Sequence, residues 1–124
     1  MKILLIDDDA DSLECLSTSL EPAGYRCDKF TVPEEAVEAF YQSQYDVVIT
    51  DMKMPGLNGI QVLKMVRSFD QQVKVIFVTA YGDRETAAAA VNHGAYAFLG
   101  KPVDFAKLME ILEKIDKETK NMSA

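Results

Sequence analysis

The chain has 124 residues, of which 48% are hydrophobic, so it is long enough to fold as one domain with its own core. Lys and Arg number 13 against 20 Asp and Glu, and the resulting net charge of -7 argues against a nucleic-acid-binding face. The short apolar run after Met1 excludes a signal peptide and a membrane span at this point, so we expect a cytoplasmic domain without membrane contact.

Two further expectations concern the domain as a whole. Residues 1–120 should form the domain and residues 121–124 a polar tail, with fraying already from Lys117. Cys15 and Cys27 fall in different predicted elements and lack the close spacing of a metal or redox pair, so buried free thiols are expected.

The chain begins with a predicted strand, the apolar run Ile3–Ile6, which ends directly at the aspartates Asp7–Asp9. Leucines then recur at helical spacing from Leu13 to Leu20 and predict a helix. Asp9 or Asp11 can cap its free amides, and Gly24 suits a left-handed stop. The first strand therefore delivers carboxylates at its carboxyl end.

The second predicted strand shows only a weak alternation of apolar and polar residues, whereas the helix after it has a clear apolar face. Tyr25–Phe30 alternates weakly and carries polar residues, so it is predicted to be an edge strand. Pro33 suits the first turn of a helix with Ala36, Val37 and Phe40 on its apolar face.

The central strand is predicted from three consecutive β-branched residues, Val47–Ile49, and Asp51 follows at its carboxyl end. Ligands of open α/β sheets bind at that edge, so this carboxylate is well placed for chemistry. After a loop rich in Pro and Gly, Asn58 can cap a third helix. The predicted apolar face of that helix consists of Val62, Leu63, Val66 and Phe69.

The last part of the chain contains two more strands, each followed by a helix. Val73–Val78 predicts a buried strand that runs into Thr79, and Ala95–Leu99 predicts a short strand that leads to Lys101. Between them, Asp83 should open a helix that stops at His93, for which a structural role is expected. Asp104 should cap the last helix, whose predicted apolar face is Phe105, Leu108, Met109, Leu112 and Ile115.

Strands alternate with helices five times, which predicts an α/β fold with a five-stranded parallel sheet and five helices on both faces. The flavodoxin-like strand order 2-1-3-4-5 is the common one for five such units. In that order the first and third strands are neighbours, and Asp7, Asp8 and Asp51 converge. Two such charges at ~4 Å in an effective dielectric of ~20 repel by roughly 4 kcal/mol, and Mg²⁺ is the cation that oxygen ligands of this kind favour.

Two more groups are expected at the same edge. Lys101 offers an ammonium group and Thr79 a hydroxyl, although in isolation the first would be a surface lysine and the second a strand terminator. Carboxylates for a metal, one carboxylate to attack, and donors for the transferred oxygens are what phosphoryl transfer requires. We infer that Asp51 accepts a phosphoryl group.

Four segments, in the expected order at the predicted strand ends, resemble the receiver domain of two-component response regulators, a chemotaxis-regulator-like family. They are the acidic pair in LLIDDD, then DMKMPGLNG, VTA and GAYAFLGKPV, and the resemblance covers about residues 2–117. It implies a phosphorylation switch rather than an enzyme, although such a domain assists its own phosphorylation and dephosphorylation.

The resemblance also implies residue roles. Asp51 resembles the phospho-acceptor, Asp8 a direct Mg²⁺ ligand, Asp7 a ligand through water, and the Lys53 backbone carbonyl the third protein ligand. The groups implied in binding and reading the phosphoryl group are the Thr79 hydroxyl, the Lys101 ammonium and, as switch aromatic, Phe98, which could otherwise be plain core. The Lys101–Pro102 bond is often cis in the family.

The partners implied are a sensor histidine kinase or phosphotransfer protein as donor. A partner, an output domain or a second copy would bind the surface of the fourth helix, fifth strand and fifth helix, and phosphorylation would change its affinity. The chain is then either a single-domain regulator or a receiver from a longer protein.

Some positions depart from the commonest pattern of the family. Asn58 stands where aspartate is frequent, which preserves capping. Lys53 and Tyr81 lie two residues beyond Asp51 and Thr79, and their large side chains are predicted to restrict the attacking water and lengthen the phosphorylated lifetime.

Two other classes of protein share part of this pattern. A haloacid dehalogenase-type phosphatase also uses an aspartate nucleophile, but that aspartate lies in a DxD motif after the first strand, and a cap domain selects the substrate. In this chain the isolated Asp51 follows the third predicted strand, and no cap domain is expected. A flavin-binding module is disfavoured because the loops after the first and third strands are acidic and would repel a phosphate.

Overall fold

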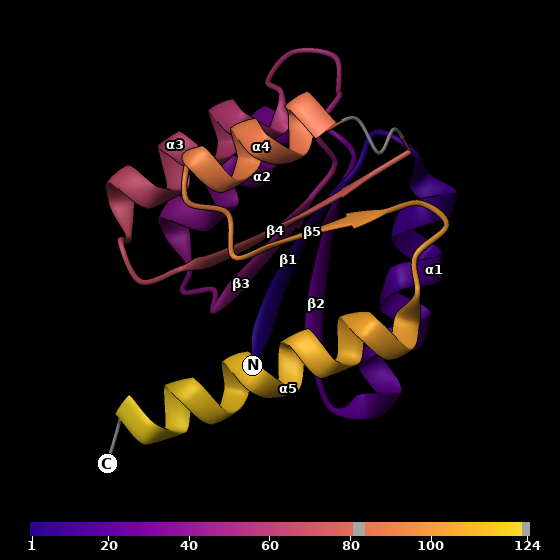
Figure 1. Ribbon diagram of the computed structural model, residues 1–124, viewed down its shortest axis with the longest axis vertical. Helices are drawn as coiled ribbons and strands as arrows, with labels where there is room; N and C mark the ends of the chain where they lie inside the picture. Colours follow the sequence, from indigo (N-terminus) through magenta and orange to yellow (C-terminus); the bar gives the residue numbers. More distant parts are fainter. Residues whose placement is uncertain (81–83, 123–124) are drawn as a thin grey trace.

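The computed structural model describes residues 1–80 and 84–122, and the side chains of 84–87 and 120–122 lie outside that description (Figure 1). Strands and helices alternate along the chain, as predicted. The elements are β1 (Lys2–Ile6), α1 (Ala10–Leu20), a 3-10 turn (Glu21–Ala23), β2 (Arg26–Phe30), α2 (Pro33–Gln42), β3 (Val47–Thr50), α3 (Gly59–Phe69), β4 (Lys74–Thr79), α4 (Arg84–Asn92), β5 (Ala97–Gly100) and α5 (Phe105–Met122).

The five strands form one parallel sheet in the order β2-β1-β3-β4-β5, which confirms the predicted topology. β2 lies at an edge, in agreement with its polar sequence. β1 and β3 are neighbours with Ile6 opposite Thr50, and the Asp51 amide donates to the Ile6 carbonyl at 3.0 Å. This register places Asp7 and Asp51 side by side at the carboxyl edge of the sheet.

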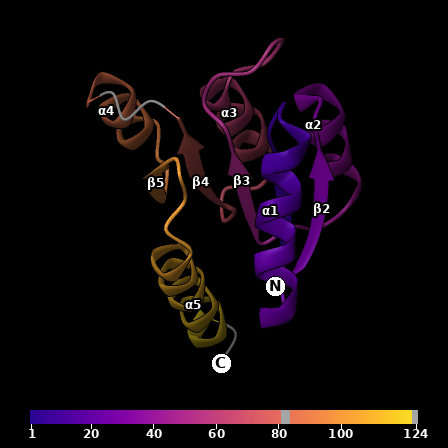
Figure 2. The ribbon, with the colours of Figure 1, turned by 90° about the vertical axis from the view of Figure 1, so that its right-hand side faces the viewer.

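Helices cover both faces of the sheet (Figures 1 and 2). One core layer lies under α2, α3 and α4 and contains Phe40, Leu63 and Ala90, whereas the other lies under α1 and α5 and contains Leu16 and Leu112. β3 is buried along its whole length, as expected for a central strand covered on both faces. The sheet is therefore a rigid support for the loops at its carboxyl edge.

Capping side chains fix where the helices begin. The Asp9 carboxylate accepts from the Asp11 amide at 3.0 Å at the start of α1. Asn58 and Gln61 form a reciprocal capping box at the start of α3, with distances of 2.8 and 2.9 Å. Asp104 accepts from the Lys107 amide at 3.2 Å at the start of α5. All three predicted caps are confirmed.

Two expectations about exposure were wrong. Phe69, predicted on the apolar face of α3, is 60% exposed because it ends the helix at the rim of the core, where it packs edge-on against Phe40. Cys15 is exposed, although both cysteines are free as predicted. α5 continues to Met122, so the segment from Lys117 is helical as far as that residue, and fraying of the tail stays a prediction. Asp83, expected to open α4, lies outside the described residues.

Within the described residues, we find no helix that combines the length and the apolar character needed to cross a membrane.

Candidate functional site

Three carboxylates converge at the carboxyl edge of the sheet, as the sequence predicted. Asp7 follows β1 and Asp51 follows β3, and their residues are only 3% and 8% exposed, whereas Asp8 is exposed. Carboxylate oxygens of Asp7, Asp8 and Asp51 all lie within 4.8 Å of one another. The sheet register thus gathers these acidic groups into one site.

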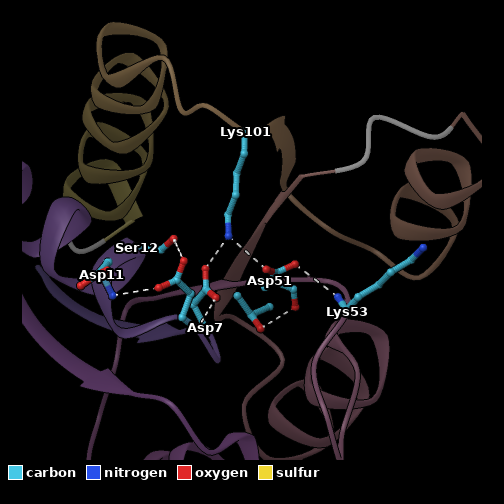
Figure 3. A network of polar contacts seen from close by, with 8 residues as sticks. Asp7, Asp11, Ser12, Asp51, Lys53 and Lys101 are labelled. Atoms are coloured by element: carbon cyan, nitrogen blue, oxygen red, sulfur yellow. Dashed lines mark hydrogen bonds and ion pairs between the residues drawn. The ribbon is translucent and has the colours of Figure 1, made fainter.

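Lys101 inserts its ammonium group between two of these carboxylates (Figure 3). Its Nζ atom donates to Asp7 Oδ2 at 2.7 Å and to Asp51 Oδ2 at 3.1 Å. Partial burial alone would lower the pKa of Lys101, but the hydrogen bonds to Asp7 and Asp51 and their negative charges outweigh burial and raise it. Lys101 is therefore a fully charged counter-ion of the site at neutral pH.

The backbone beside Lys101 holds that side chain in place. The Lys101 amide donates to the Thr79 carbonyl at 2.7 Å, which ties the end of β5 to the end of β4. The Lys101–Pro102 peptide bond is cis, as the resemblance implied.

The donor set of the site fits a hard divalent cation. Among the described residues, three carboxylates face the ammonium group of Lys101, so negative charge is in excess there, and carboxylate oxygens are the ligands that Mg²⁺ prefers. Asp8, which is exposed, would present its oxygens at the open side of the site, where water can complete the coordination.

The profile of the response regulator receiver domain matches residues 3–113 of the chain. The chain belongs to this family. It is therefore a receiver domain of two-component signalling, as the sequence motifs implied.

Curated relatives of this receiver domain are longer proteins. The phosphoglycerate transport system transcriptional regulatory protein PgtA of Salmonella typhimurium is 39% identical over 98% of this chain, which covers 29% of that protein. The DNA-binding transcriptional regulator NtrC of Escherichia coli is 31% identical over 90% of this chain, which covers 24% of that protein. The receiver domain thus spans less than a third of the length of either relative.

Solved structures share the fold over almost the whole chain. A response regulator receiver domain protein from Clostridium thermocellum aligns with a TM-score of 0.91 and 32% identity, covering 98% of each chain. The response regulator protein TrrA from Thermotoga maritima, in complex with Mg²⁺ and BeF, aligns with a TM-score of 0.83 and 32% identity, covering 92% of this chain and 97% of that one.

Lys53 contributes its backbone to the site of the receiver domain. Its amide donates to Asp51 Oδ1 at 3.3 Å, which helps to orient the carboxylate. Figure 3 shows its long side chain extending away from Asp51 rather than across it. Tyr81, the other large residue named from the sequence, lies outside the described residues.

Thr79 and Phe98 occupy the neighbouring strands β4 and β5. Thr79 ends β4, is 1% exposed and lies opposite Gly100 of β5. Phe98 lies opposite Phe77, is half-buried, and packs against the core layer that also contains Ala90 of α4. Phe98 therefore lies in the core layer that α4 covers, whereas Thr79 lies at the carboxyl end of β4, the edge at which Asp7 and Asp51 lie.

Gly59 is a site residue whose role the sequence did not reveal. A Cβ atom at this position would lie 2.7 Å from the Asp51 carbonyl oxygen, 2.9 Å from Phe77 and 3.0 Å from the Met52 Cα. In addition, the Gly59 amide donates to the Met52 carbonyl at 2.8 Å. Glycine therefore lets the start of α3 pack directly on the backbone that carries Asp51. The only signal in the sequence was a glycine directly after the predicted cap, Asn58.

Proposed function

We propose that Asp51 accepts a phosphoryl group from a sensor histidine kinase or a phosphotransfer protein, with Mg²⁺ bound beside it. The observation that supports this most strongly is the grouping of Asp7, Asp8, Asp51 and Lys101 at one edge of the sheet. In this proposal the domain, residues 1–120 with a short tail, acts in the cytoplasm as a regulated switch rather than as an enzyme with a substrate of its own.

The reaction is a displacement at phosphorus. A carboxylate oxygen of Asp51 forms a bond to phosphorus while the P–N bond of the donor phosphohistidine breaks, and the imidazole nitrogen leaves with the electron pair and takes up a proton. The backbone amide of Lys53 orients the carboxylate at 3.3 Å. Lys101, 3.1 Å from the other carboxylate oxygen, is placed to stabilise negative charge on the transferred oxygens.

Mg²⁺, when bound, would neutralise charge on the phosphoryl oxygens. Asp8 and Asp51 would hold it directly, Asp7 through water, and the backbone carbonyl of Lys53 would be the third protein ligand. The proximity of the three carboxylates supports this assignment. The Thermotoga relative solved with Mg²⁺ and BeF supports it by analogy.

The consequence of phosphorylation is a change in the surface beyond the site. The Thr79 hydroxyl would move toward the phosphoryl group, and the half-buried Phe98 would turn into the space that it leaves. The face of α4, β5 and α5 would then change its affinity for a partner, an output domain or a second copy. The domain itself would not contact DNA, because its net charge is -7.

The test is phosphorylation with acetyl phosphate and Mg²⁺, followed by intact-mass measurement. The wild type should gain the mass of one phosphoryl group, and an excess of chelator should abolish the gain. Asp51→Asn should not be modified, whereas Asp46→Asn, at the opposite end of β3, should react like the wild type. Full modification of Asp51→Asn would refute the proposal.

A further inference from the structure

Arg67 of α3 connects the segments that precede β4 and β5, the strands that carry Thr79 and Phe98. Its Nε atom donates to the carbonyl of Val73, which directly precedes β4, at 3.1 Å. Its terminal nitrogen donates at 2.8 Å to the carbonyl of Gly94, in the turn between α4 and β5. A planar guanidinium with its fixed fork of donors can hold two such acceptors at once.

Gly94 is shaped to receive this guanidinium. Its φ angle is +91°, in the left-handed region, and it ends α4 while its amide donates to the Val91 carbonyl at 3.0 Å. A Cβ atom at Gly94 would lie 3.1 Å from an Arg67 nitrogen. The absence of a side chain therefore lets Arg67 approach the carbonyl of the turn.

The packing of α4 gives this contact its importance. Among the side chains of α4 that the structure describes, 88–92, Ala90 is buried, whereas Val91 is 67% exposed. A helical segment with so little buried apolar surface opens locally at low free-energy cost. Within 88–92, the hydrogen bonds at the C-terminal end of the helix therefore add to the small apolar contact that holds this segment to the sheet.

We propose that Arg67 is a positioning residue that fastens the C-terminal end of α4 and the start of β5 to the body of the domain. It acts through the backbone of Gly94 and touches none of the reacting groups. β5 carries Phe98 and leads to Lys101, so Arg67 also sets the position of that strand against β4 from the end opposite Asp51. The inference goes beyond the proposed function, because it requires neither metal nor phosphoryl group.

The first test is hydrogen exchange of unmodified protein. Arg67→Gln should accelerate exchange of the amides of 93–95 by about tenfold, as loss of the hydrogen bond to the Gly94 carbonyl implies, without a matching rise in α1. The exchange rate of these amides in Arg67→Lys should lie between those of the wild type and Arg67→Gln, because an ammonium group can reach one carbonyl but cannot bridge two. Lys64→Gln, an exposed cation on the same helix, should leave exchange unchanged.

A glycine comparison keeps the inference falsifiable if Arg67→Gln is poorly stable. Gly24 has a φ of +96°, and a Cβ atom there would meet nothing within 4 Å, so Gly24→Ala carries backbone strain alone. Gly94→Ala carries the same strain and also displaces Arg67, so it should lower the denaturant midpoint further, and this excess should vanish in an Arg67→Gln background. The proposal would be overturned if Gly24→Ala and Gly94→Ala lowered the denaturant midpoint equally. It would also be overturned if Arg67→Gln left the exchange rates at 93–95 unchanged, or raised those in α1 by the same factor.

Discussion

The Nζ atom of Lys101 lies 2.7 Å from Asp7 Oδ2, a shorter distance than the 3.1 Å that separates it from Asp51 Oδ2. Lys101 therefore pairs with two carboxylates rather than with Asp51 alone. Both carboxylates are largely buried, so the ammonium group offsets repulsion that water cannot screen well. Among the ion pairs of the described residues, those of Lys101 balance part of the negative charge of these two carboxylates.

Replacing Lys101 with Met should destabilise the metal-free protein by roughly 2 kcal/mol, because two buried carboxylates lose their counter-ion. The pKa of Lys101 is raised above its ordinary value of 10.5, so this contribution is fully present below pH 10.5 and is lost as the pH rises through the raised pKa. Urea unfolding of both proteins at a series of pH values should show a constant difference near neutrality that shrinks above pH 10.5. A difference that grows in alkali would contradict this role.

Asp8→Asn should affect metal binding and stability in opposite directions. The exposed Asp8 adds repulsion to Asp7 and Asp51, so its removal should stabilise the metal-free protein by on the order of 1 kcal/mol. It should also weaken Mg²⁺ binding at least tenfold, as measured by calorimetric titration. Undiminished Mg²⁺ affinity would remove Asp8 from the metal site.

Gly59→Ala should destabilise the fold by about 1–3 kcal/mol, because the added methyl group meets backbone atoms that cannot move aside. Gly100→Ala is the matched control, since a Cβ atom there would have no neighbour within 4 Å. Chemical denaturation compares the two variants. Equal stabilities would show that α3 can retreat from the Asp51 backbone without cost.

The double variant Lys53→Ala plus Tyr81→Ala should shorten the lifetime of the phosphorylated protein, if these side chains restrict the attacking water. The Lys53 side chain points away from Asp51 before phosphorylation, so any shielding by it requires a rearrangement (Figure 3). Decay of the phosphorylated mass after removal of the donor gives the half-life. An unchanged or longer half-life would exclude this role.

The grouping of Asp7, Asp8 and Asp51 could be predicted from the sequence because it depends only on where the strands end and on their parallel order. Each carboxylate closely follows an apolar run, and parallel strands place their carboxyl ends at one edge. Lys101 and Thr79 could be placed at that edge for the same reason. The preference of Lys101 for Asp7 could not, because it depends on side-chain geometry that strand order does not determine.

Other features depend on contacts between elements distant in sequence. The exposure of Phe69 reflects where α3 ends relative to the core, which helical spacing does not reveal. The length of α5 reflects anchoring at Glu118, whose carboxylate accepts from the Tyr96 hydroxyl at 3.2 Å. The close approach at Gly59 and the contacts of Arg67 likewise arise only once the helices are packed on the sheet.

The most direct test of the central claim is to locate the phosphoryl group itself. After reaction with acetyl phosphate and Mg²⁺, borohydride reduces an aspartyl phosphate to homoserine, which peptide mass mapping can place in the sequence. We predict homoserine at position 51 alone, and none when Mg²⁺ is withheld. Homoserine at Asp7, Asp8 or any other aspartate of the wild type, with Asp51 unchanged, would contradict the account.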